Sequence, residues 1–295
     1  MIYTKPVFRP QGDHNLLVEY GDEANLELCF RVLELNKKIA ESGVQGILET
    51  MPTIRSLSVF YDPRKVRYKE LVKKIGELDS GLQIPKTIST RNVRVPIWFD
   101  DPWSRECAMA NLDCWDHKFG GGVSSNIEYI AKFNDTTVDE IIRQISSNCW
   151  FVPTIGFAPG DFVAYPIRPA NYTLTCPLYI KPRTRTYPRI LNTVGNIMTI
   201  YPVGSPGGGQ LLGCTPWNMF EPSQKNSIFK DLPVWIRVAD LLQFVPIDEV
   251  AYERIRHEVE EGVCNYEDSM EDGSLDVEAY RRSLLEYKEK TYGRA

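Results

Sequence analysis

The sequence lacks long uninterrupted apolar runs. No window in its 295 residues approaches the ~18 consecutive apolar residues of a membrane-spanning helix. The opening segment, MIYTKPVFRPQGD, also lacks the apolar stretch of a secretory signal. We therefore expect a cytoplasmic protein that does not associate with a membrane.

Histidine is scarce, and cysteine is not arranged for metal binding. The three histidines stand far apart at positions 14, 117 and 257, and none belongs to an H-E-x-x-H motif. The seven cysteines include no C-x-x-C pair. The sequence thus predicts no metal site, and cysteines scattered in this way are typical of free thiols in a reducing compartment.

Several motifs of nucleotide-dependent and covalent enzymes are missing. There is no Gly-Lys-Ser/Thr phosphate loop, no strand–GxGxxG–helix order and no G-x-S-x-G nucleophile turn. No Met-Lys-Met sequence for biotin attachment occurs, and no basic stripe with interleaved aromatics suggests a nucleic-acid partner. If ATP or biotin takes part in the function, another polypeptide carries it.

The composition is that of a globular protein. With 43% hydrophobic and 25% charged residues, the chain can bury the core of one large domain or two moderate ones. The net charge of −5 is uneven, because fourteen acids face seven Lys/Arg from Asp248 onward, which leaves +2 for residues 1–247. An acidic C-terminal segment of this kind is typical of solvated helix faces.

Residues 1–92 follow the order β-α-β-β-α-β. That order over roughly 90 residues predicts a ferredoxin-like α+β domain. A larger mixed sheet that continues into the next segment is the alternative. The strand and helix patterns lie, in order, at residues 15–20, 25–41, 45–51, 56–61, 68–78 and 92–99.

Residues 93–248 form the predicted second domain. Helical patterns at 125–130 and 137–147, the latter capped by Thr136 or Thr137, precede a β-rich stretch of short strands between Pro and Gly clusters. That stretch, 149–247, indicates a sandwich or barrel.

Residues 249–295 form a predicted helical C-terminal extension. Its two helices, 249–261 and 276–290, flank an acidic loop. We expect the loop Asp268–Ser274 to give the second helix reach toward a partner subunit. Residues 265–295 should then be dispensable for folding.

Two loops dense in glycine and proline mark places where the backbone approaches another group closely: Ile155–Asp161 and Ser205–Gln210. In the first, Gly160 precedes Asp161. The Asp161 carboxylate can accept hydrogen bonds from a urea-like or amide NH2 group and, if desolvated, serve as a base. An aspartate that closes its own turn is the alternative.

The second loop, Ser205–Gln210, offers backbone N–H groups at its glycines that can surround an anion or a carbonyl. Gln210 adds an amide with two donors and one acceptor. A tight barrel turn, with glycine supplying a positive φ, is the alternative.

These loops, together with Arg9–Asp13 and Thr53–Asp62, resemble the family described as allophanate hydrolase subunit 1 or 5-oxoprolinase-B. The same family forms half of the carboxyltransferase domain of urea carboxylase. The resemblance runs from about Pro10 to the C-terminus. It implies a cyclophilin-like β-barrel over residues 93–248.

Two branches of the family are mixed in this chain. Asp161, Val95–Pro102 and Ser125–Tyr129 resemble the urea-carboxylase branch, whereas Phe157–Pro159 resembles the 5-oxoprolinase branch. The segment Asn192–Pro202 departs from both, because it lacks the small Gly-Ala-Gln part of the family pattern.

The resemblance also implies site residues. Arg183 and Arg185 match a family segment, and a guanidinium there could hold a carboxylate; a salt bridge at the barrel rim is the alternative. Asn196 is expected to replace part of the missing Gly-Ala-Gln segment. With Asp161 as the catalytic residue, the expected substrate-binding set is Gly160, Arg183, Arg185, Asn196, Pro206, Gly207, Gly208 and Gln210.

The implied function is one half of a carboxyltransferase-like site in a biotin-dependent urea or amide carboxylase. A homologous subunit 2 would complete the site, so the chain would be inactive alone. Biotin and ATP would be carried by partners, including a biotin carboxylase or carrier. The alternatives are the B component of an ATP-dependent 5-oxoprolinase, which opens a lactam, and a binding protein that inhibits a histidine kinase.

Overall fold

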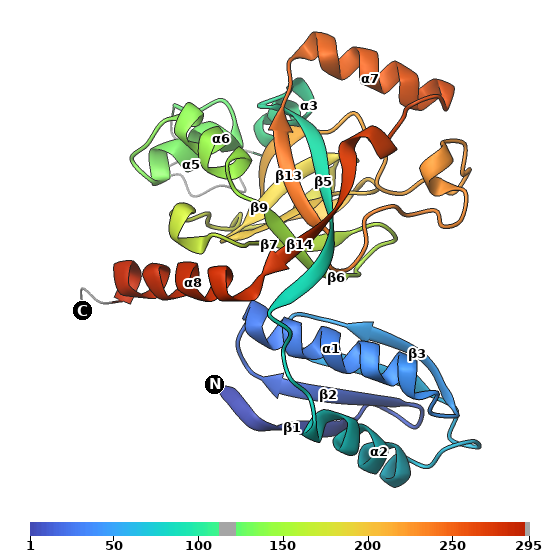
Figure 1. Ribbon diagram of the computed structural model, residues 1–295. Helices are drawn as coiled ribbons and strands as arrows, with labels where there is room; N and C mark the ends of the chain where they lie inside the picture. Colours follow the sequence, from blue (N-terminus) through green and yellow to red (C-terminus); the bar gives the residue numbers. More distant parts are fainter. Residues whose placement is uncertain (112–121, 293–295) are drawn as a thin grey trace. The chain divides into compact units, whose positions relative to one another are not determined.

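The structure is a computed structural model that describes residues 1–111 and 122–292 (Figure 1). The chain divides into two compact units, Met1–Ile88 and Ser89–Ala295. The first boundary thus lies slightly before residue 92, where we had expected it. The C-terminal extension, expected as a separate segment from residue 249, belongs to the second unit.

The first unit is an antiparallel sheet with two helices. The strand order is β1-β2-β4-β3. One cluster of buried apolar side chains joins both helices to the sheet, so the core lies between the helices and one sheet face. The elements are β1 (Ile2–Pro10), β2 (Asn15–Gly21), α1 (Leu26–Ser42), β3 (Ile47–Pro52), β4 (Ser56–Tyr61) and α2 (Tyr68–Ser80).

Helix α1 forms where the apolar period predicts it. The side chain of Asn25 caps its N-terminus by accepting a hydrogen bond from the backbone N–H of Glu27 at 2.9 Å. Gly43, with φ 61°, ends it. The apolar positions of the period are all buried: Leu28, Val32, Leu35 and Ile39.

The second unit is built on a closed barrel. In the described residues, seven strands follow in the order β12-β9-β10-β7-β6-β13-β5, and β12 also pairs with β5, which closes the ring (Figure 1). The predicted barrel is confirmed, while the cyclophilin likeness stays a prediction. The strands are β5 (Thr87–Phe99), β6 (Trp150–Ile155), β7 (Phe162–Pro166), β9 (Ile190–Val194), β10 (Ile197–Ile200), β12 (Gln210–Cys214) and β13 (Leu241–Pro246).

The strand expected to complete the first sheet, Asn92–Phe99, lies in this barrel instead. It is the second half of β5 and pairs in parallel with β13. The place beside β2 is taken by β1. The ferredoxin-like prediction is therefore wrong in its last strand. The alternative of one larger mixed sheet is wrong as well, because the first unit keeps a separate four-stranded sheet. The physical reason is burial: Val93, Val95 and Ile97 are each at most 1% exposed inside the barrel core.

Three short helices precede or flank the barrel strands, and each begins at a capping side chain. Asp101 accepts hydrogen bonds from the backbone N–H groups of Trp103 and Ser104. Thr137, one of the two predicted caps, accepts from the N–H of Glu140 at 3.2 Å. The helices are α3 (Pro102–Met109), α5 (Asn126–Phe133) and α6 (Val138–Ser146).

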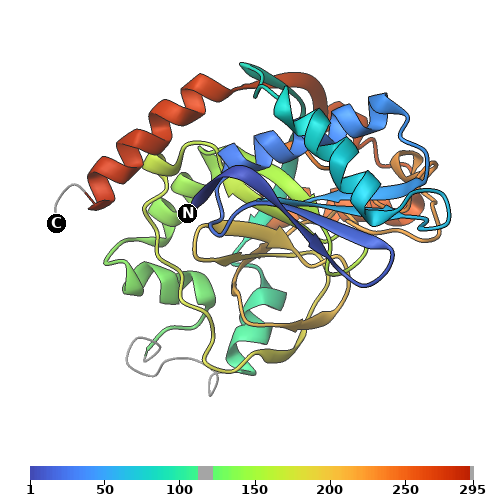
Figure 2. The ribbon, with the colours of Figure 1, turned by 90° about the horizontal axis from the view of Figure 1, so that it is seen from below.

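The C-terminal segment contains the two predicted helices, α7 (Glu249–Glu261) and α8 (Val277–Tyr292). The part between them is not a flexible loop. It contains strand β14 (Met270–Asp276), which lies next to β5 in the large sheet. Figure 2 shows α8 continuing from this strand to the end of the described chain.

The C-terminal segment is therefore part of the second unit's core. Tyr266 and Val277 are fully buried, and Tyr280 is 5% exposed. The expected reach of Asp268–Ser274 toward a partner is wrong, because most of that stretch is strand. We also no longer expect 265–295 to be dispensable, since its removal would expose the apolar side chains packed against Tyr266.

None of the described helices combines the length and the apolar content that a membrane crossing requires. The six cysteines in the described part of the chain are free, as the sequence predicts.

Candidate functional site

The first Gly/Pro loop joins β6 to β7 and presents Asp161. Its turn is closed by backbone hydrogen bonds, from Gly156 N–H to the Asp161 carbonyl and from Asp161 N–H to the Ala158 carbonyl, both 3.0 Å. Gly160 has φ +79°, and a Cβ there would lie 2.6 Å from the carbonyl oxygen of Met219. Only glycine allows this approach, which holds Asp161 at the start of β7.

The Asp161 carboxyl is bound across strands rather than within its own turn. Its Oδ1 accepts a hydrogen bond from the hydroxyl of Thr199 on β10 at 2.6 Å. Burial raises the pKa of Asp161, while the Thr199 hydroxyl and the Phe162 backbone N–H oppose that rise. A half-buried carboxyl with a raised pKa is suited to accept and release a proton nearer neutral pH.

Tyr201, which follows β10, connects Asp161 to the second loop. A Cβ at Gly207 would lie 1.8 Å from the Tyr201 hydroxyl, so this glycine makes room for the phenol. Burial raises the pKa of Tyr201, Arg183 and Thr186 lower it, and the nearby Asp161 adds to the rise. The predicted residues Asp161, Arg183 and Gly207 are therefore gathered around one tyrosine that we did not predict.

Arg183 lies in the interior rather than at the barrel rim, and among the described residues it forms no salt bridge. It is fully buried, and its Nη1 donates to the carbonyl of Gly209 at 2.7 Å. Its Nε donates to Thr186 at 3.2 Å, and Nη2 lies 3.5 Å from the Tyr201 hydroxyl. The guanidinium also stacks 4.4 Å from the ring centre of Tyr179. Arg183 thus stabilises the second Gly/Pro loop from the interior of the protein, and its positive charge lies on the inner side of that loop.

Gln210 is likewise an interior residue. It is 2% exposed, its Nε2 donates to the carbonyl of Pro177 at 2.6 Å and its Oε1 accepts from Asn126 at 2.9 Å. Asn126 in turn accepts from the Tyr179 hydroxyl at 2.8 Å. Both the nitrogen and the oxygen of the Gln210 amide are therefore bonded inside the protein.

Backbone groups of the second loop also bind other parts of the protein. Its strand, β11 (Ser205–Gly207), pairs with β8 (Arg183–Thr186). The carbonyl of Gly208 accepts from the N–H of Tyr179 at 2.9 Å. Pro206 is exposed at the surface of this pairing, whereas Gly207 and Gly208 are half-buried.

Two predicted residues lie apart from this group. Arg185 is exposed, sits 5.5 Å from the ring centre of Tyr187 and lines a hollow of about 250 Å³ with Glu106 and Cys107. Asn196 is exposed at the β9–β10 turn, three residues and about 10 Å of strand from Thr199. Its expected replacement of the missing small residues is not supported by this position.

We call Asp161, Thr199, Tyr201, Arg183 and Thr186 the Tyr201 cluster. Thr199 and Tyr201 alternate with Met198 and Ile200, which point into the barrel core. That alternation was visible in the sequence and could have indicated the polar pair. The cluster offers proton transfer and hydrogen bonding. Burial raises the pKa of the nearby Cys214 thiol to about 12, which disfavours its thiolate form.

The chain matches the family model described as carboxyltransferase domain, subdomain C and D, over residues 6–230. It is 27% identical over 284 residues to urea amidolyase of Saccharomyces cerevisiae, covering 94% of this chain and 15% of that protein. It is 28% identical over 251 residues to the B component of 5-oxoprolinase from Bacillus subtilis, covering 84% of this chain and 95% of that protein.

A solved structure is similar over the whole chain. The crystal structure of the Kluyveromyces lactis urea carboxylase aligns with a TM-score of 0.78 at 23% identity, covering 100% of this chain and 26% of that chain. At this identity the likeness shows the fold alone. The chain spans 15% of the length of the yeast urea amidolyase. The family match extends over more than half of this chain, which therefore belongs to the family of the carboxyltransferase domain, subdomains C and D.

Proposed function

We propose that this chain supplies one part of a carboxyltransferase site in a biotin-dependent urea or amide carboxylase, and that a homologous subunit 2 supplies the rest. The observation that carries the proposal is the Asp161 carboxyl, held by Thr199 near Tyr201, in a chain of this family. The family description names subdomains C and D, which supports a site that further subdomains complete.

In this proposal Asp161 binds and orients the substrate. Its carboxylate would accept hydrogen bonds from the NH2 group of a urea-like substrate and take the proton that nitrogen loses on carboxylation. Arg183 would act from the inner side of the second Gly/Pro loop. Its positive charge would stabilise an oxyanion at that loop without direct contact with the oxyanion. Arg183 and Gln210 are thus positioning residues.

In this proposal biotin is attached to another polypeptide and binds this site only transiently. The half-buried carboxyl of Asp161 and the exposed residues Pro206 and Arg185 can meet a group brought from outside. When bound and carboxylated, biotin supplies the carboxyl group to be transferred. ATP would be used only on a partner subunit.

A second candidate function is that of the B component of a 5-oxoprolinase. The match to the Bacillus subtilis protein covers 95% of that protein, so a relative of nearly the same extent carries that name. The Phe157–Pro159 part of the first loop also resembles that branch. Inhibition of a histidine kinase stays a prediction that no observation favours.

Reconstitution separates the two candidates. The chain would be combined with the subunit 2 homologue from the same genome and assayed for urea carboxylation with added carboxylated biotin carrier, and for ATP-dependent opening of 5-oxoproline. We expect carboxylation only with both subunits present. Lactam opening without carboxylation would favour the second candidate, and full turnover by this chain alone would contradict both half-site proposals.

A further inference from the structure

Arg189, in the second unit, carries a positive charge that the surrounding protein does not pair. The residue is half-buried, and among the described residues no carboxylate oxygen lies within 4.0 Å of its guanidinium nitrogens. Its Nε is sealed from solvent and has no hydrogen-bond partner. Burying a charge is costly unless an opposite charge and hydrogen bonds accompany it. The guanidinium therefore lacks part of the surroundings that a buried charge requires.

Other arginines of this protein show what such surroundings look like. The fully buried Arg183 has no carboxylate beside it, but each of its three terminal nitrogens faces an oxygen acceptor. Three half-buried arginines each donate to a carboxylate, at 2.8, 2.6 and 2.8 Å: Arg31 to Asp79, Arg91 to Asp240 and Arg256 to Glu260. Arg189 has neither arrangement.

The contacts of the Arg189 side chain are long and neutral. Its Nη2 lies 3.5 Å from the hydroxyl of Tyr252 on α7, and that hydroxyl lies 3.5 Å from the sulfur of Cys214. Its Nη1 has no partner among the described residues and, unlike Nε, is in contact with solvent. A ligand can therefore approach the edge formed by Nη1 and Nη2 from outside.

Glu260 on α7 interacts with Arg189 only from a distance. Its carboxylate accepts a hydrogen bond from Nε of Arg256 at 2.8 Å. That bond lowers the pKa of Glu260, and the more distant charge of Arg189 adds to the lowering. Two guanidinium groups thus share one carboxylate, which is bonded to Arg256. The positive charge of Arg189 is left without a bonded counter-ion.

The backbone holds Arg189 in an uncommon conformation. Its φ is +70°, in the left-handed region that favours glycine. Its N–H donates to the carbonyl of Tyr201 at 2.6 Å, and its carbonyl accepts from the N–H of Thr215 at 3.0 Å. These bonds fix the residue between the ends of β10 and β12. Strained residues that are held in this way are concentrated at ligand sites.

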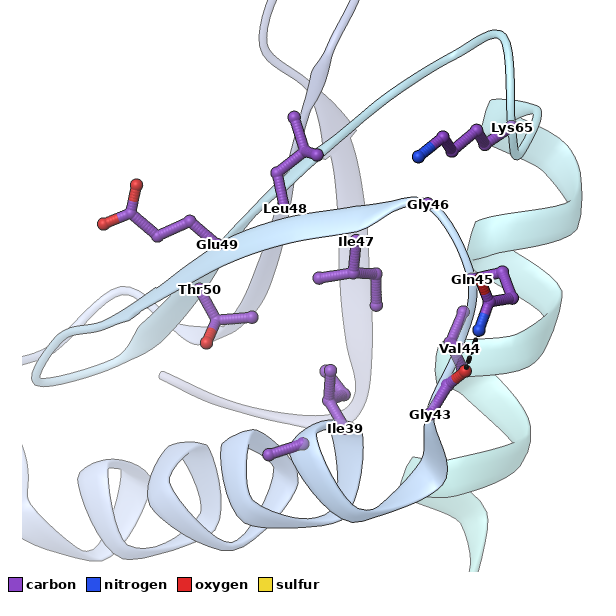
Figure 3. Close-up of a pocket in the computed structure, with 11 residues that line it drawn as sticks. Ile39, Gly43, Val44, Gln45, Gly46, Ile47, Leu48, Glu49, Thr50 and Lys65 are labelled. Atoms are coloured by element: carbon purple, nitrogen blue, oxygen red, sulfur yellow. Dashed lines mark hydrogen bonds between the residues drawn. The ribbon is translucent and has the colours of Figure 1, made fainter.

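The hollow of about 410 Å³ along β3 in the first unit shows the opposite case (Figure 3). Its two charged lining residues, Lys65 and Glu49, are exposed, so water can satisfy their charges. Arg189 differs because part of its guanidinium is out of reach of water. A charge that neither water nor the protein satisfies in full indicates that a further group binds there.

We propose that Arg189 binds a small oxyanion, the phosphate or carboxylate group of a ligand, at its open Nη1–Nη2 edge. The planar guanidinium can donate two parallel N–H···O hydrogen bonds to two oxygens of such a group. The bound anion then supplies the counter-ion that the protein itself lacks. The inference does not depend on the proposed function.

The test is calorimetric titration of the full chain with inorganic phosphate, at an ionic strength held constant with sodium chloride. We expect a Kd on the order of 1 mM. Arg189→Met should weaken binding at least about tenfold, because both donors are lost. Arg189→Lys should lie between the two, since an ammonium group keeps the charge but not the planar pair of donors. Acetate, titrated separately, should bind more weakly; tighter binding of acetate would identify a carboxylate as the ligand group.

Arg254→Met is the matched control. Arg254 is an exposed arginine on α7 that is bonded to Glu258, so its replacement removes the same charge from a neighbouring part of the surface. This variant should bind phosphate as the original chain does. A loss as large as that of Arg189→Met would show a general effect of surface charge and would overturn the proposal.

Urea denaturation provides a second readout. Phosphate at ten times its Kd should lower the unfolding equilibrium constant of the original chain about tenfold and leave that of Arg189→Met unchanged. Without phosphate, Arg189→Met should be at least as stable as the original chain, because it removes a buried charge that has no counter-ion. The proposal is wrong if phosphate neither releases heat nor stabilises the original chain, or if Arg189→Met binds phosphate equally well. An Arg189→Met chain that is markedly less stable without phosphate would also overturn it, since the neutral contacts would then hold the guanidinium by themselves.

Discussion

Arg183 and Arg185 stand two residues apart on the same strand and share one sequence motif, yet their surroundings are opposite. Arg183 is fully buried and bonded to Gly209 and Thr186. Arg185 is exposed beside Tyr187. The difference shows that two identical residues in one motif can have different roles. Arg183 supports the loop from inside, whereas Arg185 faces outward, where a ligand could reach it.

Two aspartates make the same contrast. Burial raises the pKa of both Asp101 and Asp161. Asp101 is fully buried, and its carboxyl accepts hydrogen bonds from its own helix, namely from the Ser104 hydroxyl and the backbone N–H groups of the first turn of α3. Asp161 is only half-buried and is held by a hydroxyl from another strand. A raised pKa therefore does not by itself identify a functional site. What distinguishes Asp161 is that its carboxyl is half-exposed and is bonded to another strand rather than to its own helix.

The largest effect should come from the buried arginine. Arg183→Met leaves the buried carbonyl of Gly209 and the Thr186 hydroxyl without their donor and removes the stack on Tyr179. We expect the free energy of unfolding to fall by about 4 kcal/mol. Urea denaturation would measure it, with Arg185→Met as the matched control. Equal stability of the two variants would remove the contrast between the arginines.

The second effect is a pH dependence from Asp101. Burial raises its pKa from 3.8 to about 6. The folded state then binds more protons than the unfolded state between these values, so its stabilising contribution is complete below pH 3.8 and is lost as the pH rises through about 6. The stability difference between the original chain and Asp101→Asn should therefore shrink by up to about 3 kcal/mol over this window.

Denaturation of both proteins at pH 4 to 7 would measure that change. Asp248→Asn corrects for exchanging a capping aspartate for asparagine, because Asp248 caps α7 from an exposed position. A difference that stays constant, or that grows with rising pH, would contradict the assignment.

The third effect is on activity rather than stability. In a complex reconstituted with subunit 2, Asp161→Asn should lower kcat about 10- to 100-fold, the scale of one hydrogen bond to a charged group in the transition state. The melting temperature should stay close to the original value. Thr199→Val keeps the carboxyl but removes its holding hydroxyl, so we expect a smaller loss. Normal kinetics of a folded Asp161→Asn complex would exclude a catalytic role.

The smallest effect should come from the exposed arginine. Arg185→Met should change the free energy of unfolding by less than about 0.5 kcal/mol. If Arg185 holds an anionic group, KM should rise about tenfold with little change in kcat, because that contact is equal in substrate and transition state. Arg185→Lys should recover part of the loss. A KM that does not move would place Arg185 outside the site.

Much of the local structure was predictable. Helices α1 and α7 begin at capping side chains, Asn25 and Asp248, and end at glycines with positive φ. These signals are local, so the sequence shows them directly. The positions of Asp161 and Gly160 on a turn were also predictable, since Gly/Pro spacing marks such turns.

The misplaced strands had no local signal that could have corrected them. β1 contains two prolines and does not alternate, so it does not look like a strand. β5 does look like one, but its sheet is chosen by which neighbours bury it. β14 is short, acidic and contains glycine, and only its pairing with β5 makes it a strand.

By itself, the sequence determined the helices, the turns, the barrel class and the family to which the chain belongs. The tertiary structure alone decided that Arg183 and Gln210 are interior residues, that Asn196 lies apart, and that Tyr201 stands between Asp161 and Arg183. The reason is physical: the availability of a polar side chain depends on which distant backbone groups it meets when the barrel closes. These tertiary contacts join residues that are far apart in the sequence, so no local sequence pattern predicts them.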